Sequence, residues 1–174
     1  MRLILFAFVP LALSGQDDRP AVRTESIIVT GTFEPVPLDE SDRDVSAFPL
    51  TPDQRLLVST PLQLLREDSS VDVQTRAPNG IQADVSIRGA SFGQTLVLLN
   101  GLRFNDAQSG HHNFDLPLPL DMVGRLEVLK GTGSMFYGSD AVGGVVNVIS
   151  RTPDALEVRL RGAFGNFGTN QQSA

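Results

Sequence analysis

Cysteine and tryptophan are absent from the 174 residues, and the chain has only two histidines and one tyrosine. Without cysteine there are no disulfides, no thiolate zinc sites and no cysteine nucleophiles. Basic residues are also in the minority, with 14 Lys and Arg against 20 Asp and Glu and a formal net charge of −6. A surface that neutralises nucleic-acid phosphates needs a basic face, so this balance argues against a nucleic-acid partner.

Catalytic and metal-binding constellations are not indicated either. Ser134 and Ser139 lie near neither His111 nor His112 in sequence, and no hydrolase elbow is expected, so we predict no enzyme and no cofactor. Adjacent residues of a strand point to opposite faces, and the chain has no third histidine. The two histidines therefore do not predict a preformed metal site, and a contact with a ligand or within the loop is the favoured role.

The first 16 residues have the pattern of a secretory signal peptide. Met1-Arg2 supplies a positive charge, Leu3 to Leu13 an apolar core, and Ser14 and Gly15 small residues that suit cleavage. The apolar core is too short for a bilayer-spanning helix, which takes about 20 residues. A buried N-terminal helix or strand is the alternative.

Residues 17–44 are predicted to be a flexible N-terminus. The β-branched run Ile27-Ile28-Val29-Thr30 lies within it, and an unpaired extended segment of this kind offers backbone donors and acceptors to the sheet edge of a partner. The first strand of the domain is the alternative interpretation. Pro35, Pro37 and the acidic residues around them indicate a linker.

A small α+β domain with a mixed sheet and short helices is predicted for residues 45–154. Thr60 at an N-cap and Pro61 at a first helical position predict a helix, and Thr51-Pro52-Asp53 predicts a turn. Apolar or alternating patterns predict strands over residues 45–50, 71–74, 84–89, 95–103, 123–130 and 145–149. Asn100-Gly101, which closes the apolar part of the 95–103 run, is a strong turn signal.

The stretch 123–150, VGRLEVLKGTGSMFYGSDAVGGVVNVIS, has the most specific pattern in the chain. Glycines permit positive φ and close backbone approach, which predicts two strands folded tightly together, joined by a connection with an exposed Met-Phe-Tyr. A phosphate-binding loop is a weaker alternative. The lysine precedes the glycines, and Phe136 stands where a dinucleotide fingerprint needs glycine, so a nucleotide-binding enzyme is disfavoured.

Three segments carry a resemblance to a known family, namely 127–131 (EVLKG), 137–149 (YGSDAVGGVVNVI) and 87–89 (IRG). They resemble the plug domain of TonB-dependent outer-membrane receptors. Lys130 and Thr132 depart from the family, which more often has arginine and proline at these places. The resemblance covers most of the mature chain and implies an α+β plug fold.

The same resemblance implies roles for individual residues. Ile27, Ile28, Val29 and Thr30, within 25–32, resemble the TonB box, which the periplasmic energiser TonB captures by strand addition. Arg88, Glu127 and Lys130 are implied to pair with charges on the wall of the receptor's own barrel. The loop after the Asn-Gly turn is implied to meet the ligand, through Asn105, Asp106, Gln108, His111, His112 and Asn113.

Residues 155–174 are predicted to begin a barrel. Leu156, Val158, Leu160 and Phe164 alternate with charged residues, as in an outer-membrane strand, and this strand has no expected partner. The implied barrel has about 22 strands, most of it absent from the chain.

The implied function is energy-coupled uptake of a large scarce nutrient across the outer membrane, in which the exported plug gates passage. A corrinoid such as cobalamin is favoured because the loop Asn-Gly-Leu-Arg-Phe-Asn-Asp resembles that subgroup, and a ferric siderophore is nearly as well supported. A soluble periplasmic ligand-binding module without transport is the alternative.

Overall fold

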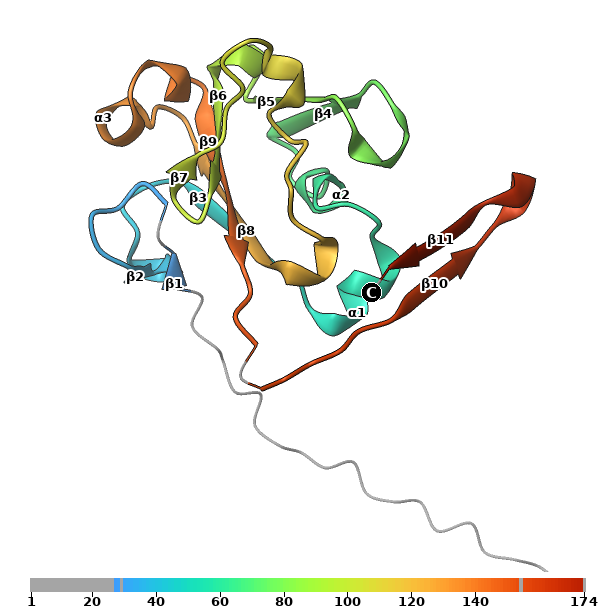
Figure 1. Ribbon diagram of the computed structural model, residues 1–174. Helices are drawn as coiled ribbons and strands as arrows, with labels where there is room; N and C mark the ends of the chain where they lie inside the picture. Colours follow the sequence, from blue (N-terminus) through green and yellow to red (C-terminus); the bar gives the residue numbers. More distant parts are fainter. Residues whose placement is uncertain (1–26, 29, 154, 174) are drawn as a thin grey trace, which may run out of the picture.

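The structure is a computed structural model that describes residues 27–28, 30–153 and 155–173 (Figure 1). The predicted signal peptide, the segment 17–26 and Val29 lie outside the described residues. Within the described ranges, no helix has the length and apolar character needed to cross a bilayer.

Eleven strands are described, several of them only two residues long: β1 Ile27–Ile28, β2 Val36–Pro37, β3 Val45–Pro49, β4 Val71–Thr75, β5 Ala83–Ile87, β6 Thr95–Leu99, β7 Leu102–Arg103, β8 Val123–Lys130, β9 Gly144–Ser150, β10 Arg161–Phe164 and β11 Asn170–Ser173. The α-helices are α1 Pro52–Leu57, α2 Leu62–Leu65 and α3 Ser134–Tyr137. Short 3-10 turns complete the described elements: η1 Leu38–Glu40, η2 Pro78–Gly80, η3 Phe92–Gln94, η4 Gly110–His112, η5 Leu120–Met122, η6 Ser139–Ala141 and η7 Asn166–Gly168.

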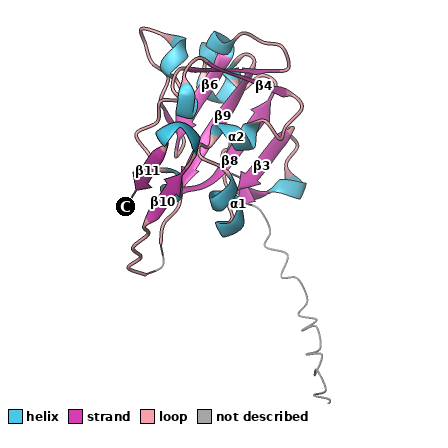
Figure 2. Cartoon of the chain, turned by 90° about the vertical axis from the view of Figure 1, so that its right-hand side faces the viewer, coloured by secondary structure: helices cyan, strands magenta, loops and turns pink. Residues whose placement is uncertain are grey.

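A five-stranded mixed sheet in the order β3-β8-β9-β6-β7 forms the centre of the molecule. β6 and β9 run parallel, whereas β3 with β8, β8 with β9 and β6 with β7 run antiparallel. The predicted α+β class and mixed sheet are therefore confirmed. The predicted tight pairing within residues 123–150 is also confirmed, because β8 and β9 pair over most of their length (Figure 2).

Gly143 and Gly144 allow this close packing. A Cβ on Gly143 would lie 2.4 Å from the Cβ of Ala90, and one on Gly144 would lie 2.6 Å from the carbonyl oxygen of Leu129. Gly144 also has a φ of +156°. Neither position has room for a side chain, so the glycine pair is needed where β9 enters the sheet.

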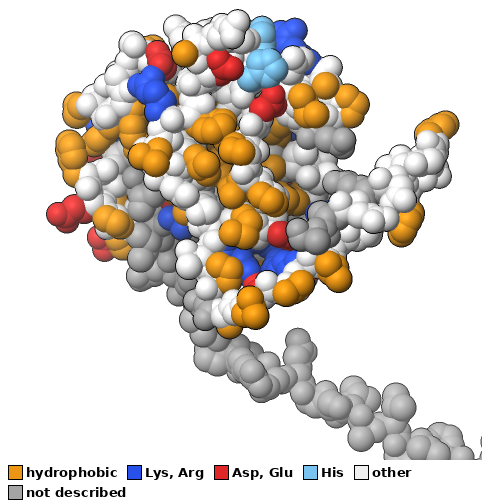
Figure 3. Space-filling model, viewed as in Figure 1, with side chains coloured by type: hydrophobic (Ala, Val, Ile, Leu, Met, Phe, Trp, Pro, Cys, Tyr) orange, Lys and Arg blue, Asp and Glu red, His pale blue; other side chains and the backbone are white. Residues whose placement is uncertain are grey.

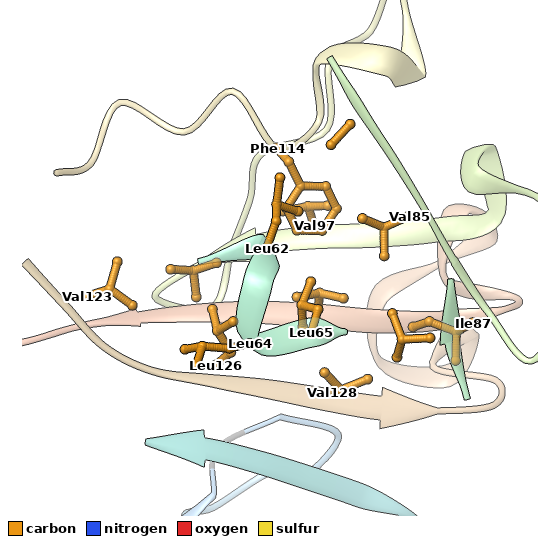
Figure 4. Packing of buried hydrophobic residues seen from close by; sticks show 14 of the residues in the cluster. Leu62, Leu64, Leu65, Val85, Ile87, Val97, Phe114, Val123, Leu126 and Val128 are labelled. Atoms are coloured by element: carbon orange, nitrogen blue, oxygen red, sulfur yellow. The ribbon is translucent and has the colours of Figure 1, made fainter. Parts of the chain in front are cut away.

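One face of the sheet carries the larger apolar core (Figure 4). Leu64 and Leu65 of α2 are fully buried in the same cluster as Leu126 and Val128 of β8, and the β4–β5 hairpin adds Val85. Full burial of a side chain of this size contributes about 1.5–3 kcal/mol. This face therefore supplies most of the apolar stabilisation.

The opposite face has a smaller apolar cluster made by Leu96, Leu98, Leu129, Ala141 and Val145. The turn after β1 and the helix α3 lie on this side of the sheet, where Gly31 approaches the side chain of Leu129 and bonds to Tyr137. Two buried polar side chains, Glu127 and Asn147, contact the same turn.

The segment 114–120 lies along the outside of the larger core. Its hydrophobic side chains and Leu62 of α2 line a groove of about 480 Å³, and Figure 3 shows hydrophobic side chains gathered on this face. Phe114 is buried at one end of the segment, whereas Leu116 and Leu118 are half-buried.

The helix predicted to begin at Thr60 has a different start. Pro61 is the N-cap residue of α2, and no side chain caps that helix, which has only four residues. The capped helix is α1, at the position predicted to be a turn: the Thr51 hydroxyl accepts a hydrogen bond from the Gln54 N–H, and the Gln54 side chain accepts one from the Thr51 N–H. This capping box makes Thr51, and not Thr60, the signal that starts a helix.

The predicted strand over residues 156–164 was also partly wrong. Only Arg161–Phe164 forms a strand, and β10 pairs antiparallel with β11, so it has a partner in this chain. Leu156 is 98% exposed and Phe164 is 80% exposed. The alternating apolar side chains therefore do not pack against an apolar surface among the described residues.

Candidate functional site

The predicted TonB-box residues that the structure describes lie against the central sheet, and Val29 lies outside the described residues. Ile27 pairs with Pro37 and Ile28 with Val36, and the side chains of Ile28 and Thr30 are fully buried. Ile27 and Ile28 are therefore paired within the chain, in line with the alternative interpretation of this run as a strand of the domain, and the flexibility of residues 17–44 stays a prediction. Gly31, at a φ of +76°, turns the chain so that β2 returns alongside β1.

A buried polar cluster holds Thr30. Glu127 and Asn147 face each other across β8 and β9, and both are fully buried. The Thr30 N–H donates to Glu127 Oε2 at 2.9 Å, and the Thr30 hydroxyl donates to the same oxygen at 2.5 Å. Asn147 Nδ2 donates to Thr30 Oγ1 at 3.0 Å. We call Thr30, Glu127 and Asn147 the polar latch.

The polar latch supplies hydrogen-bond donors to the buried carboxylate of Glu127. A buried carboxylate is costly unless charges or hydrogen-bond donors surround it. Arg125 Nε lies 2.8 Å from Glu127 Oε1, so the guanidinium donates to one carboxylate oxygen and Thr30 donates to the other. Thr30, a residue of the predicted box, therefore supplies two of the hydrogen bonds that Glu127 accepts.

A second set of contacts fixes the turn that follows the box. The Gly31 N–H donates to the Tyr137 hydroxyl at 3.1 Å. The ring of Phe33 lies 4.9 Å from the ring of Phe136 in α3, and the guanidinium of Arg43 lies 5.4 Å from the Phe136 centroid. The Met-Phe-Tyr connection was predicted to be exposed. Two of its three side chains instead contact the β1–β2 hairpin, and the third, Met135, is highly exposed.

The three charges predicted to pair with a barrel wall have partners in this chain. Arg88 forms an ion pair with Asp44, Lys130 Nζ lies 2.9 Å from Asp68 Oδ2, and Glu127 belongs to the polar latch. Each of the three charges therefore has a contact among the described residues. Pairing with a barrel wall stays a prediction, and it suits Arg88, whose side chain is half exposed.

The Lys130–Asp68 pair perturbs the carboxyl group. Burial raises the pKa of Asp68, but hydrogen bonds from Ser70 and the pairing with Lys130 outweigh burial and lower the pKa to about 2. The carboxylate is therefore charged at neutral pH and contributes to stability there.

The predicted ligand-contact loop divides into two groups. Asn105 Oδ1 accepts from the Val97 N–H at 2.6 Å, and Asn113 Oδ1 accepts from the Asp106 N–H at 2.9 Å, so both amides hold the loop. Asp106 and Gln108 are exposed. Backbone hydrogen bonds from Gln108 and Ser109 lower the pKa of Asp106. Ligand contact stays a prediction, best suited to Asp106 and Gln108.

The two histidines of the loop contact different carboxylates. His111 Nδ1 lies 2.5 Å from Asp84 Oδ1, and His112 Nδ1 lies 2.7 Å from Asp115 Oδ2. Burial raises the pKa of Asp84, but hydrogen bonds from His111 and Arg76 outweigh burial and lower it. Among the described residues, no group of three or more His, Cys, Asp or Glu could hold a metal ion.

Residues 89–93 form a Gly-x-Ser-x-Gly string, contrary to the expectation that the sequence holds no such motif. A hydrolase elbow places its serine between a strand and a helix, beside a histidine. Ser91 instead caps the three-residue η3, and its N–H donates to Gln94 Oε1. Within the described part of the chain, no hydrogen bond joins Ser91 to His111, so the string forms a turn here.

Comparison with known proteins identifies the fold. A family model described as the TonB-dependent Receptor Plug Domain matches residues 38–145. The Vitamin B12 transporter BtuB of Vibrio vulnificus is 30% identical over 136 residues, covering 76% of this chain and 22% of that protein. The Vitamin B12 transporter BtuB of Vibrio cholerae is 32% identical over 127 residues, covering 73% of this chain and 21% of that protein.

Solved structures agree in fold. The ferripyoverdine receptor of the outer membrane of Pseudomonas aeruginosa matches with a TM-score of 0.58 and 17% identity, covering 79% of this chain and 17% of that one. The alcaligin receptor FauA of Bordetella pertussis matches with a TM-score of 0.56 and 18% identity, covering 73% and 21%. The chain spans about a fifth of the length of the curated relatives it matches. It belongs to the TonB-dependent receptor plug domain family.

Proposed function

We propose that the chain is the plug region of an outer-membrane receptor that takes up a large scarce nutrient with energy delivered by TonB. The plug gates the passage and catalyses no reaction. Ile27, Ile28, Val29 and Thr30 form the TonB box, and TonB captures them by adding a strand. The remainder of such a receptor is a barrel around the plug.

The observation that carries the proposal is the way the box is held. β1 pairs with β2 over only two residues, and the polar latch holds Thr30. The box is thus held on the plug by a two-residue strand pair and by the hydrogen bonds to Thr30, and we expect strand pairing with TonB to replace the pairing with β2. A segment held in this way suits release and recapture.

The substrate proposed first is a corrinoid. The curated relatives that support this choice are named as vitamin B12 transporters and are 30% and 32% identical. The exposed side chains of Asp106 and Gln108 offer a carboxylate and an amide, which suit a ligand rich in amide groups. A ferric siderophore is the alternative, because the ferric enterobactin receptor of Pseudomonas aeruginosa is 26% identical with a TM-score of 0.50.

Whole-cell uptake of labelled cyanocobalamin by a complete receptor that carries this plug tests the box. Ile28→Pro removes the backbone donor of a β1 residue and disfavours sheet pairing, so uptake should fall to the level of cells without TonB. Glu34→Pro is the matched control, since Glu34 lies exposed in the same hairpin outside the paired residues, and it should leave uptake intact. Unchanged uptake with Ile28→Pro would reject the box assignment.

Parallel uptake of a ferric siderophore separates the two substrates. TonB-dependent uptake of cyanocobalamin alone supports the corrinoid proposal. TonB-dependent uptake of the siderophore alone would overturn the corrinoid choice and keep the transport proposal, whereas TonB-independent uptake of both would overturn the transport proposal.

A further inference from the structure

We infer that Asn147 couples the β6–β7 hairpin, which leads into the predicted ligand-contact loop, to the docking of the box. The inference rests on the proposed function and deepens it, because it names the residue through which movement at one end of the plug reaches the box. Its basis is the placement of one buried amide between two segments that have different roles.

Both ends of the Asn147 side chain are occupied. Nδ2 donates to Thr30 Oγ1 in the box at 3.0 Å, and Oδ1 accepts from the Gly101 N–H in the β6–β7 turn at 3.0 Å. Asn147 and its hydrogen bond to Thr30 are fully buried, so water does not replace Thr30 as the partner without opening of the structure, whereas the bond to Gly101 is partly buried. A shift of the turn therefore bears on the amide that holds Thr30.

The β6–β7 hairpin connects the predicted ligand-contact loop to Asn147. Its turn, at Asn100 and Gly101, rests on β9: the Asn100 N–H donates to the Val148 carbonyl, and Asn100 Oδ1 accepts from the Ser150 N–H. Directly after β7, Asn105 accepts a hydrogen bond from the Val97 N–H of β6 where the loop begins. Displacement of that loop acts on the hairpin, and the hairpin turn contacts Asn147.

Arg103 adds a second link between the same two regions. Its guanidinium donates to the Tyr137 carbonyl and pairs with Asp140, and the Tyr137 hydroxyl accepts from the Gly31 N–H. The hairpin therefore contacts both groups that hold residues 30–31. This second link runs through exposed side chains, so Asn147 is the stronger of the two.

The test measures release of the box without ligand and without TonB. Ile28→Cys places a thiol at a fully buried β1 position in a chain that has no other cysteine, and the rate at which a maleimide labels this thiol reports the open fraction. In this background, Asn147→Leu should raise the rate about five- to tenfold, because two hydrogen bonds are lost. Thr30→Val, which leaves the sheet intact, should raise it similarly and serves if Asn147→Leu does not fold.

Alanine substitutions at two glycines test the coupling, because both introduce a similar backbone strain. Gly101 and Gly89 have φ of +80° and +77°, and a Cβ at either would meet nothing within 4 Å. Gly101→Ala strains the turn that contacts Asn147, so labelling of the introduced thiol should rise at least about threefold, whereas Gly89→Ala should leave the rate unchanged.

The outcomes decide the inference independently of transport. Equal labelling in Asn147→Leu, Thr30→Val and the Ile28→Cys parent would overturn the polar latch, and equal labelling in the two glycine variants would overturn the coupling. Either result leaves the uptake comparison of Ile28→Pro with Glu34→Pro untouched. If Ile28→Pro leaves uptake unchanged while Asn147→Leu still labels faster than the parent, the box assignment of the proposed function is overturned and the polar latch is retained.

Discussion

On one face of the central sheet, Leu64 and Leu65 are buried among aliphatic side chains from α2, β5 and β8. On the other face, Thr30 is buried against a carboxylate and an amide, Glu127 and Asn147. Apolar packing is non-directional and cumulative, whereas hydrogen bonds to a buried acid are few and directional. We therefore expect the apolar face to keep the plug folded, and the face that carries the polar latch to release the segment at Thr30 while the fold persists.

Leu65→Ala should have the largest effect on the free energy of unfolding. It leaves a cavity in the larger core and should cost about 2–5 kcal/mol, measured by urea unfolding. In the Ile28→Cys background, maleimide labelling under native conditions should stay near the parental rate. A labelling increase as large as that of Asn147→Leu would show that the two faces do not open separately.

Glu127→Gln should weaken the polar latch with little change of side-chain shape. The amide replaces the charged acceptor of Thr30 and the partner of Arg125, which should cost about 1–3 kcal/mol of docking free energy. Labelling of the thiol introduced at position 28 should therefore accelerate. Asp84→Asn removes another buried carboxylate, on the side of the loop, and should leave that labelling rate unchanged.

Lys130→Met should have a smaller, pH-dependent effect. The pKa of Asp68 is lowered to about 2 in the folded chain, so its contribution is present above the unfolded pKa of about 3.9 and is lost as pH falls through about 2. The variant should lose about 1–2 kcal/mol at pH 7, measured by urea unfolding, and converge with the parent near pH 2. Lys130→Arg should retain the stability, and a pH-independent loss would contradict this account.

Arg88→Gln should have the smallest effect. Both members of the Arg88–Asp44 pair are about half exposed, and exposed pairs contribute roughly 0–1 kcal/mol. Unfolding at low and high salt should differ little between parent and variant. A loss well above about 1 kcal/mol would show that this pair is a structural element of the plug.

Local patterns predicted much of the sheet. The glycine spacing and apolar runs of 123–150 correctly indicated the β8–β9 pair, and Asn100-Gly101 correctly indicated the β6–β7 turn. The helix at Pro52–Leu57 was within reach too, because Thr51 and Gln54 have the spacing of a capping box.

The sequence pattern did not predict which residues far apart in the chain contact each other. Thr30 and Glu127 are 97 positions apart, and nothing in either segment shows that they meet. The β-branched composition of Ile27 and Ile28 predicted an extended segment but not its pairing with β2, which depends on the turn at Gly31. The polar latch thus followed only from the three-dimensional arrangement.

Amide hydrogen exchange of Thr30 and Gly31, compared with Val128 and Val146 in the same sample, tests the two-face account most directly. The account predicts that Thr30 and Gly31 exchange well before the β8 and β9 amides, and that Asn147→Leu accelerates only the first pair. Exchange of all four amides together, at the rate of global unfolding, would contradict it.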